Sequence, residues 1–164
     1  MAWKYRPATP RDPDLLKAVA LVAIRHGHHD FSLKMALKSV MELGPTEARE
    51  KFSGWGSGRL RKKLFKECKK RIDKNAMALL QDFIDRSVDA TDERNKAVHG
   101  FWCWRGRDRI VVEVDKYGRP WPTPAELQKL AKRLNDLAYE LNCARRCGWL
   151  KASLASAAHP GVSP

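Results

Sequence analysis

Three side chains that can act together on a phosphodiester, Arg94, Asn95 and His99, lie within six consecutive residues. In an α-helix, Asn95 and His99 share a face, and the long Arg94 side chain can reach round to it. Imidazole can carry a proton near neutral pH, guanidinium binds phosphate with paired hydrogen bonds, and an amide can orient the imidazole or the substrate. These three residue types at this spacing are suited to cleavage of a phosphodiester bond. The ordinary alternative is a solvated helix end, with His99 near the negative end of the helix dipole.

Apolar residues that recur every three or four positions predict helices on both sides of this cluster. Asp12 and Pro13 signal a helix start and Gly27 its end, and a second helix is expected from Ser32 to the Gly44–Pro45 pair. Further helices are predicted at 46–52, where Thr46 is a candidate cap, at 59–74, where the residues are strongly basic, and at 77–88. A break at 89–95 and a short helix to Gly100 follow, and then a leucine-patterned helix that the Thr123–Glu126 capping box begins.

The fold class predicted is mainly α: an antiparallel bundle of five or six helices with a small β insertion near residues 101–121. The β-branched stretch 109–115 favours a hairpin, or one strand with a loop, and a turn at 115–118. Residues 12–150 are expected to form a single domain. Residues 1–11 are interpreted as a flexible basic arm, and residues 151–164 as a disordered tail.

The formal charge of +13 favours polyanionic partners, above all nucleic acid, although an acidic protein would satisfy the same electrostatics. The longest apolar run, 18–24, is far short of the roughly 20 residues that a spanning helix needs. No secretory signal is recognisable at the start, so the four cysteines are expected to be reduced in a cytoplasmic protein without membrane contact.

The stretch RNKAVH, Arg94 to His99, resembles the Arg-Asn-x-x-x-His motif of the HEPN superfamily (higher eukaryotes and prokaryotes nucleotide-binding domain). Helices before the motif, the closing His-Gly pair and the leucine-patterned helix behind it extend the resemblance over residues 12–150. The segment 101–121 is an insertion relative to the minimal family bundle.

The resemblance implies a homodimer that brings two motifs to one cleft. It also implies a metal-independent endoribonuclease without cofactors, of the kind found as toxins or phage-defence effectors. The ribose 2′-hydroxyl would attack and leave a 2′,3′-cyclic phosphate. Arg94 and His99 would be catalytic and Asn95 supporting, with RNA as substrate and an antitoxin protein as a possible partner.

The basic helix at 59–74 carries nine Lys or Arg residues and is the candidate surface for an RNA backbone, with a tryptophan available to stack on a base. The ordinary alternative is a solvated face that keeps the protein soluble. The predicted nucleic-acid-binding residues are Arg59, Arg61, Lys62, Lys63, Lys66, Lys69, Lys70 and Trp55.

Other groupings compete with this interpretation. His99, Cys103, Cys143 and Cys147 have ligand types that suit structural zinc, but buried free thiols are commoner, so no metal site is predicted. His26, His28 and His29 beside Asp30 are more typical of a polar turn between helices than of a metal site. Trp102, Trp104 and Trp121 can stack on bases, although core or dimer packing is the simpler interpretation. The alternative function is a non-catalytic helical protein that binds nucleic acid or an acidic partner through its basic surface.

Overall fold

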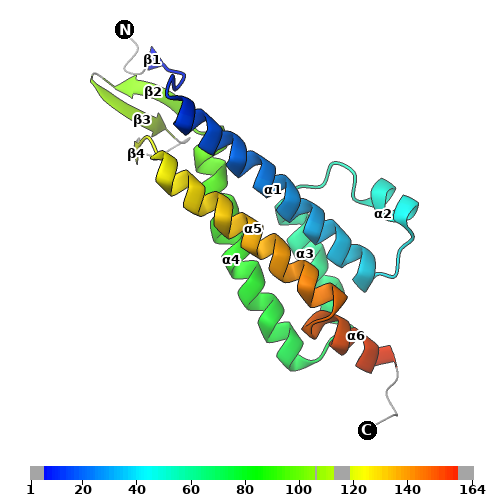
Figure 1. Ribbon diagram of the computed structural model, residues 1–164. Coiled ribbons are helices and arrows are strands. Elements are labelled where there is room, and N and C mark those ends of the chain that lie inside the picture. Colours follow the sequence, from blue (N-terminus) through cyan, green and yellow to red (C-terminus); the bar gives the residue numbers. More distant parts are fainter. Residues whose placement is uncertain (1–5, 106, 113–118, 159–164) are drawn as a thin grey trace. The chain divides into compact units, whose positions relative to one another are not determined.

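In the computed structural model, which describes residues 6–105, 107–112 and 119–158, most of the chain is helical (Figure 1). Six helices and a small antiparallel sheet confirm the predicted mainly α class over these residues. The chain divides into two compact units. We call Met1–His26 with Ala90–Leu134 the sheet unit, and Gly27–Asp89 with Asn135–Pro164 the helical unit. Helices α1 (Pro13–Val40), α4 (Lys74–His99) and α5 (Pro124–Arg146) contribute residues to both.

The sheet unit is built around the hairpin of β2 (Phe101–Arg105) and β3 (Asp108–Val112), in which Cys103 pairs with Ile110. Strand β1 (Arg6–Pro7) pairs with β2, and β4 (Arg119–Pro120) pairs with β3, which gives the order β1-β2-β3-β4. Helices α4 and α5 are linked here by an ion pair of 2.8 Å between Glu93 and Arg133. The buried apolar residues of this unit include Ala97, Cys103, Ile110, Val111, Leu127, Leu130 and Leu134.

The helical unit contains α2 (Pro45–Lys51), α3 (Ser57–Cys68) and α6 (Trp149–Ala158) beside parts of the three long helices. Ser57 donates a hydrogen bond to Asp30 at 2.5 Å, and Arg71 donates one to the Val40 carbonyl at 2.7 Å. Helix α3 therefore follows α1 in the same direction, with α2 in the connection between them. The core is mostly leucine and phenylalanine: Leu33, Leu37, Leu60, Leu64, Leu80, Phe83, Leu141 and Leu150.

Two of the predicted helix starts are confirmed in atomic detail. Asp12 Oδ1 accepts hydrogen bonds from the backbone N–H groups of Asp14 and Leu15, which caps α1 in front of Pro13. The capping box at the start of α5 is reciprocal, because Thr123 N–H donates to Glu126 and Glu126 N–H donates to the Thr123 hydroxyl. At α2, by contrast, the cap is Gly44 and not the predicted Thr46.

Two predicted interruptions are wrong. Helix α1 continues through Gly27, so the histidine-rich stretch 26–30 lies inside a helix and not in a turn. Helix α4 is likewise continuous through 89–95. A glycine inside a helix costs only about 1 kcal/mol relative to alanine, and residues on either side of Gly27, such as Val22 and Leu33, are fully buried and offset that cost. The basic helix also differs, since α3 ends at Cys68 and α4 begins at Lys74.

The expectations for the two ends of the chain also change. Arg6 and Pro7 form β1, and Ala8 N–H donates to the Trp102 carbonyl, so this part of the predicted arm belongs to the sheet. Residues 149–158 form α6, in which Ser153 is buried and donates to the Asp73 carboxylate, so residues 151–158 of the predicted tail belong to a packed helix. The predicted turn at 115–118 lies outside the described residues. None of the described helices combines the length and the apolarity that crossing a membrane requires.

Candidate functional site

The last turns of α4 bring Arg94, Asn95 and His99 into direct contact. Arg94 Nη1 donates a hydrogen bond to Asn95 Oδ1 at 2.9 Å and lies 2.7 Å from His99 Nε2. A guanidinium nitrogen can only donate, so His99 Nε2 must accept. The contact thus matches the tautomer of His99 that carries its proton on Nδ1, with the lone pair of Nε2 directed at Arg94. Nε2 can act as a general base once Arg94 leaves this contact for a phosphate.

The three side chains differ in exposure. Asn95 and His99 are exposed, while Arg94 is half-buried. Its Nε atom is buried and has no hydrogen-bond partner among the described residues. A buried donor without a protein partner lowers the stability of the fold. The stem of Arg94 is thus held in the protein while its Nη1 reaches two exposed side chains.

The end of α4 is fixed by the sheet that follows it. A Cβ atom at Gly100 would collide with the side chain of Val111 and with the Lys96 carbonyl, so only glycine allows the chain to pass directly from α4 into β2. The Trp102 indole N–H donates to the Ala97 carbonyl at 3.1 Å and ties β2 back to the last turn of the helix. The sheet therefore positions the turn that carries His99.

The predicted RNA-binding residues lie in the helical unit and differ in exposure. Arg61 is buried, and its Nη1 donates to the carbonyl and the hydroxyl of Ser87 at 3.3 and 3.2 Å, so it is not part of the exposed surface. Lys63 donates to Glu67 at 2.8 Å, and this hydrogen bond is the main cause that lowers the pKa of Glu67. The exposed cations are Arg59, Lys62, Lys66, Lys69 and Lys70.

Trp55, predicted to stack on a base, is half-exposed and already has two partners. Its ring packs edge-on against Phe52, with centroids 5.4 Å apart, and the Arg59 guanidinium lies 3.8 Å from its centre. Cation–π contact of this kind fixes both side chains. One face of the indole is therefore covered by a cation that would itself attract phosphate.

The competing groupings do not come together as ligand sets. Within the described residues, no three His, Cys, Asp or Glu side chains are placed to share a metal ion. His99 and Cys103 belong to the sheet unit, whereas Cys143 and Cys147 belong to the helical unit. The four cysteines are free thiols, and burial raises the pKa of Cys68 to about 12.

His29 is fully buried inside the helical unit, where its Nε2 lies 2.9 Å from the Ser87 hydroxyl. Arg61 joins the same buried polar group through Ser87. The sequence shows no signal that would pair residue 29 with residue 87, because the contact spans two helices. The apolar seam of α5, at Leu127, Leu130, Leu134, Leu137 and Leu141, is buried within the chain.

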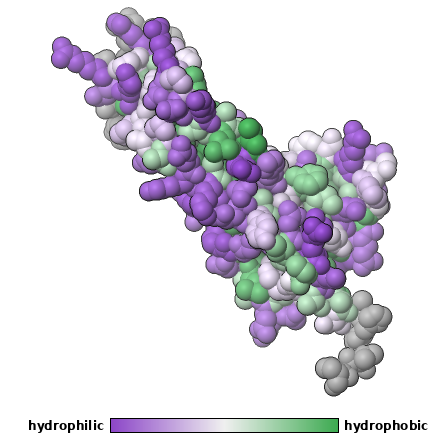
Figure 2. All heavy atoms as spheres, viewed as in Figure 1, coloured by the Kyte–Doolittle hydropathy of each residue, from purple (hydrophilic) through white to green (hydrophobic). Residues whose placement is uncertain are grey.

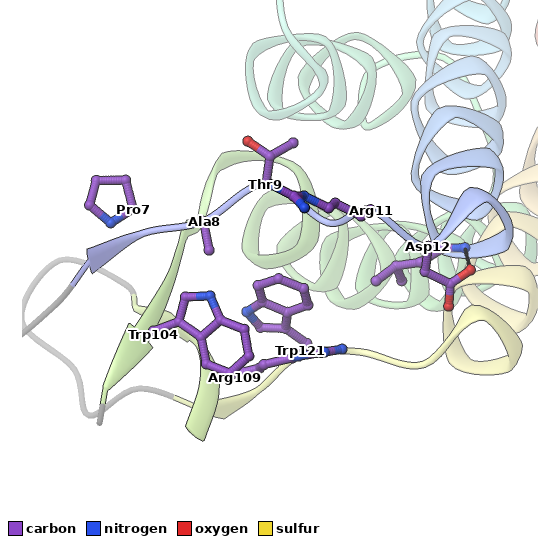
Figure 3. Close-up of a pocket in the computed structure, with 9 residues that line it drawn as sticks. Pro7, Ala8, Thr9, Arg11, Asp12, Trp104, Arg109 and Trp121 are labelled. Carbon is purple, nitrogen blue, oxygen red and sulfur yellow. Dashed lines mark hydrogen bonds between the residues drawn. The ribbon is translucent and has the colours of Figure 1, made fainter. Parts of the chain in front are cut away.

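A cavity of about 990 Å³ lies in the sheet unit between the segment before α1 and the sheet (Figure 3). Trp104 and Trp121 line it together with Arg109, whose guanidinium lies 5.0 and 5.6 Å from the two ring centres. The sequence draws attention to the tryptophans, but not to Arg109 or to Arg11 on the opposite wall. These residues meet only through pairing of β1 with β2 and of β3 with β4, which local sequence patterns do not specify.

Comparisons of this chain with protein-family models, with curated proteins and with solved structures found no match.

Proposed function

We propose that this protein is a metal-independent endoribonuclease of the HEPN type. The observation that carries the proposal is the position of Arg94 Nη1 between Asn95 Oδ1 and His99 Nε2 at the exposed end of α4. The His99 imidazole, which can take a proton, thus lies beside the Arg94 guanidinium, which can neutralise a phosphate. Asn95 holds that guanidinium in place. These residues supply a general base and a phosphate contact for cleavage of RNA through its own 2′-hydroxyl.

The chemistry begins at His99 Nε2, which takes the proton of a ribose 2′-hydroxyl. The 2′-oxygen then bonds to the adjacent phosphorus, and the bond from phosphorus to the 5′-oxygen breaks. Arg94 exchanges its contact with the imidazole for the phosphate and stabilises the negative charge that develops there. Asn95 acts as a positioning residue through the guanidinium. The products are a 2′,3′-cyclic phosphate and a 5′-hydroxyl.

A proton must also reach the departing 5′-oxygen, and the His99 of a second copy of the chain can supply it when that imidazole is in its protonated form. We therefore propose that the active form is a homodimer. In the sheet unit, Leu16 and Ile24 are 45% and 55% exposed and, with the exposed Ala20 between them, lie on one side of α1. The hydropathy of the visible face, which is mostly hydrophilic with local apolar patches, is drawn in Figure 2. The exposed apolar stripe of Leu16, Ala20 and Ile24 supports self-association.

The exposed cations of α3 support the recruitment of RNA. Arg59, Lys62 and Lys66 are exposed on a helix of a chain whose formal charge is +13, and such a surface concentrates polyanions by releasing their counterions. In a toxin–antitoxin or phage-defence setting, an acidic antitoxin protein would bind the same surface.

The proposal is tested by incubating RNA with the wild-type protein and with His99→Ala, each with excess EDTA, and by separating the products on a gel. We expect the wild type to cut despite chelation and the variant to leave the RNA intact. RNA that is uncut but shifted by both proteins would instead favour a non-catalytic nucleic-acid-binding protein. Cleavage that EDTA abolishes would contradict the metal-independent mechanism.

A further inference from the structure

The cavity of the sheet unit has the chemistry of a second site, separate from the Arg94–His99 cluster. None of the three cleavage residues lines it. Its walls come from the segment before α1, with Thr9, Arg11 and Asp12, and from the sheet side, with Trp104, Arg109 and Trp121 (Figure 3). Its volume of about 990 Å³ is at the upper end of the range for small-ligand sites.

Two half-exposed indoles give the cavity aromatic surface. The rings of Trp104 and Trp121 are 6.3 Å apart between centroids and inclined at 48°. Trp121 is fixed, because its N–H donates to the Ile110 carbonyl at 2.9 Å. For Trp104, no hydrogen bond of the indole N–H is found within the described part of the chain. Trp104 is thus the indole that is less constrained by hydrogen bonding, and an indole face stacks on any nucleobase.

The charged groups of the cavity favour an anion. Arg11 is exposed and lines the cavity, and Arg109 lies over both indoles. Among the described lining residues, the carboxylate is that of Asp12, which uses Oδ1 to cap α1. Two guanidinium groups against one engaged carboxylate leave the cavity positive. A ligand that is both aromatic and anionic fits this combination, whereas a cation does not.

We propose that this cavity binds one nucleotide of single-stranded RNA, with its base stacked on Trp104 and its phosphate on Arg11. The inference goes beyond cleavage, since it holds whether or not the bound strand is cut. A connection to the turn that carries His99 supports a strand as ligand. The edge of Trp102 packs on Trp121 at 5.1 Å between centroids, and its N–H donates to Ala97 in that turn. Single-stranded RNA is required because the bases of a duplex are already stacked on one another.

The test measures fluorescence anisotropy of a labelled single-stranded RNA of about ten nucleotides, in the His99→Ala background so that no strand is cut. We expect Trp104→Leu to weaken binding by roughly fivefold to a hundredfold, the range for loss of one base–aromatic stack. The matched control is Trp149→Leu, since Trp149 is also half-exposed but lies in α6. The affinity for duplex RNA should be unchanged by Trp104→Leu.

A second pair of variants avoids the packing of the sheet. Arg11→Gln and Lys51→Gln each remove one exposed positive charge, but only Arg11 lines the cavity. We expect Arg11→Gln to weaken single-strand binding several-fold more than Lys51→Gln. Equal affinities for both members of each pair, with circular dichroism showing folded proteins, would overturn the proposal. Adenosine monophosphate that binds as tightly as the oligonucleotide would also overturn it, because the site would then serve a free nucleotide.

Discussion

At the scale of single residues, Arg94 has the central position in the candidate site. Its Nη1 contacts both of the other motif residues, at 2.9 Å and 2.7 Å. Neither contact needs tertiary structure beyond the helix and the turn after it, so the sequence motif alone was enough to predict that the three side chains meet. The half-burial of Arg94 and its unpartnered Nε could not be predicted, because they depend on what packs against α4.

Replacing Arg94 by lysine should separate geometry from charge. Lysine keeps the positive charge but cannot donate from one planar group to both Asn95 and His99. We expect single-turnover cleavage of RNA by Arg94→Lys to fall by about a hundredfold or more, in line with the loss of one preorganised donor to a developing charge. Asn95→Asp, which keeps the acceptor oxygen, should cut faster than Asn95→Ala. Wild-type rates for Arg94→Lys would show that the guanidinium has no role in cleavage.

At the scale of helices and strands, two capping signals predicted helix starts correctly, whereas the signals for helix breaks did not. The Asp12 cap and the Thr123–Glu126 box involve residues two or three apart, and both were predictable from the sequence. The predicted break at Gly27 failed because burial of neighbouring side chains outweighs one poor helix former. Pairing of β1 with β2 joins residues 6 and 104, and the sequence carries no local signal for such a contact.

Gly27→Ala should stabilise the protein. Gly27 lies inside α1, and a Cβ atom there would meet no other atom within 4 Å. Alanine restricts the unfolded chain and favours the helix, so we expect the free energy of unfolding to rise by about 0.5–1 kcal/mol in urea titrations. The control is Gly100→Ala, which should lower it by about 1–3 kcal/mol because Val111 blocks the new methyl group. A destabilised Gly27→Ala variant would contradict a continuous α1.

Arg61 and Lys62 are neighbours on α3 with opposite expected roles. Arg61 is buried against Ser87, whereas Lys62 is exposed. Arg61→Ala should lower the free energy of unfolding by about 1–3 kcal/mol, since it removes hydrogen bonds from a buried polar group. Lys62→Ala should leave stability within about 0.5 kcal/mol of wild type but weaken RNA binding at low salt. Thermal melts and binding titrations on the two variants check this, and the reverse pattern would contradict the orientation of α3.

At the scale of the whole molecule, the residues proposed for cleavage and for RNA binding belong to two different units. The cleavage motif and the aromatic cavity belong to the sheet unit, and the exposed cations of α3 belong to the helical unit. Helix α4 contributes residues to both units and carries the motif at its end. The net charge of +13 favours a polyanionic partner, a prediction that charge alone cannot refine, because it does not distinguish a bound RNA from a cut one.

The most direct test of the account compares two substrates of one sequence, an RNA and its all-2′-deoxy counterpart, in single-turnover reactions of the purified protein with EDTA. If Arg94 and His99 act on the ribose 2′-hydroxyl, the RNA is cut to fragments that end in a 2′,3′-cyclic phosphate. The deoxy strand stays intact although it binds, and His99→Ala cuts neither. Cleavage of the deoxy strand, or an unchanged rate of RNA cleavage in His99→Ala, would contradict the account.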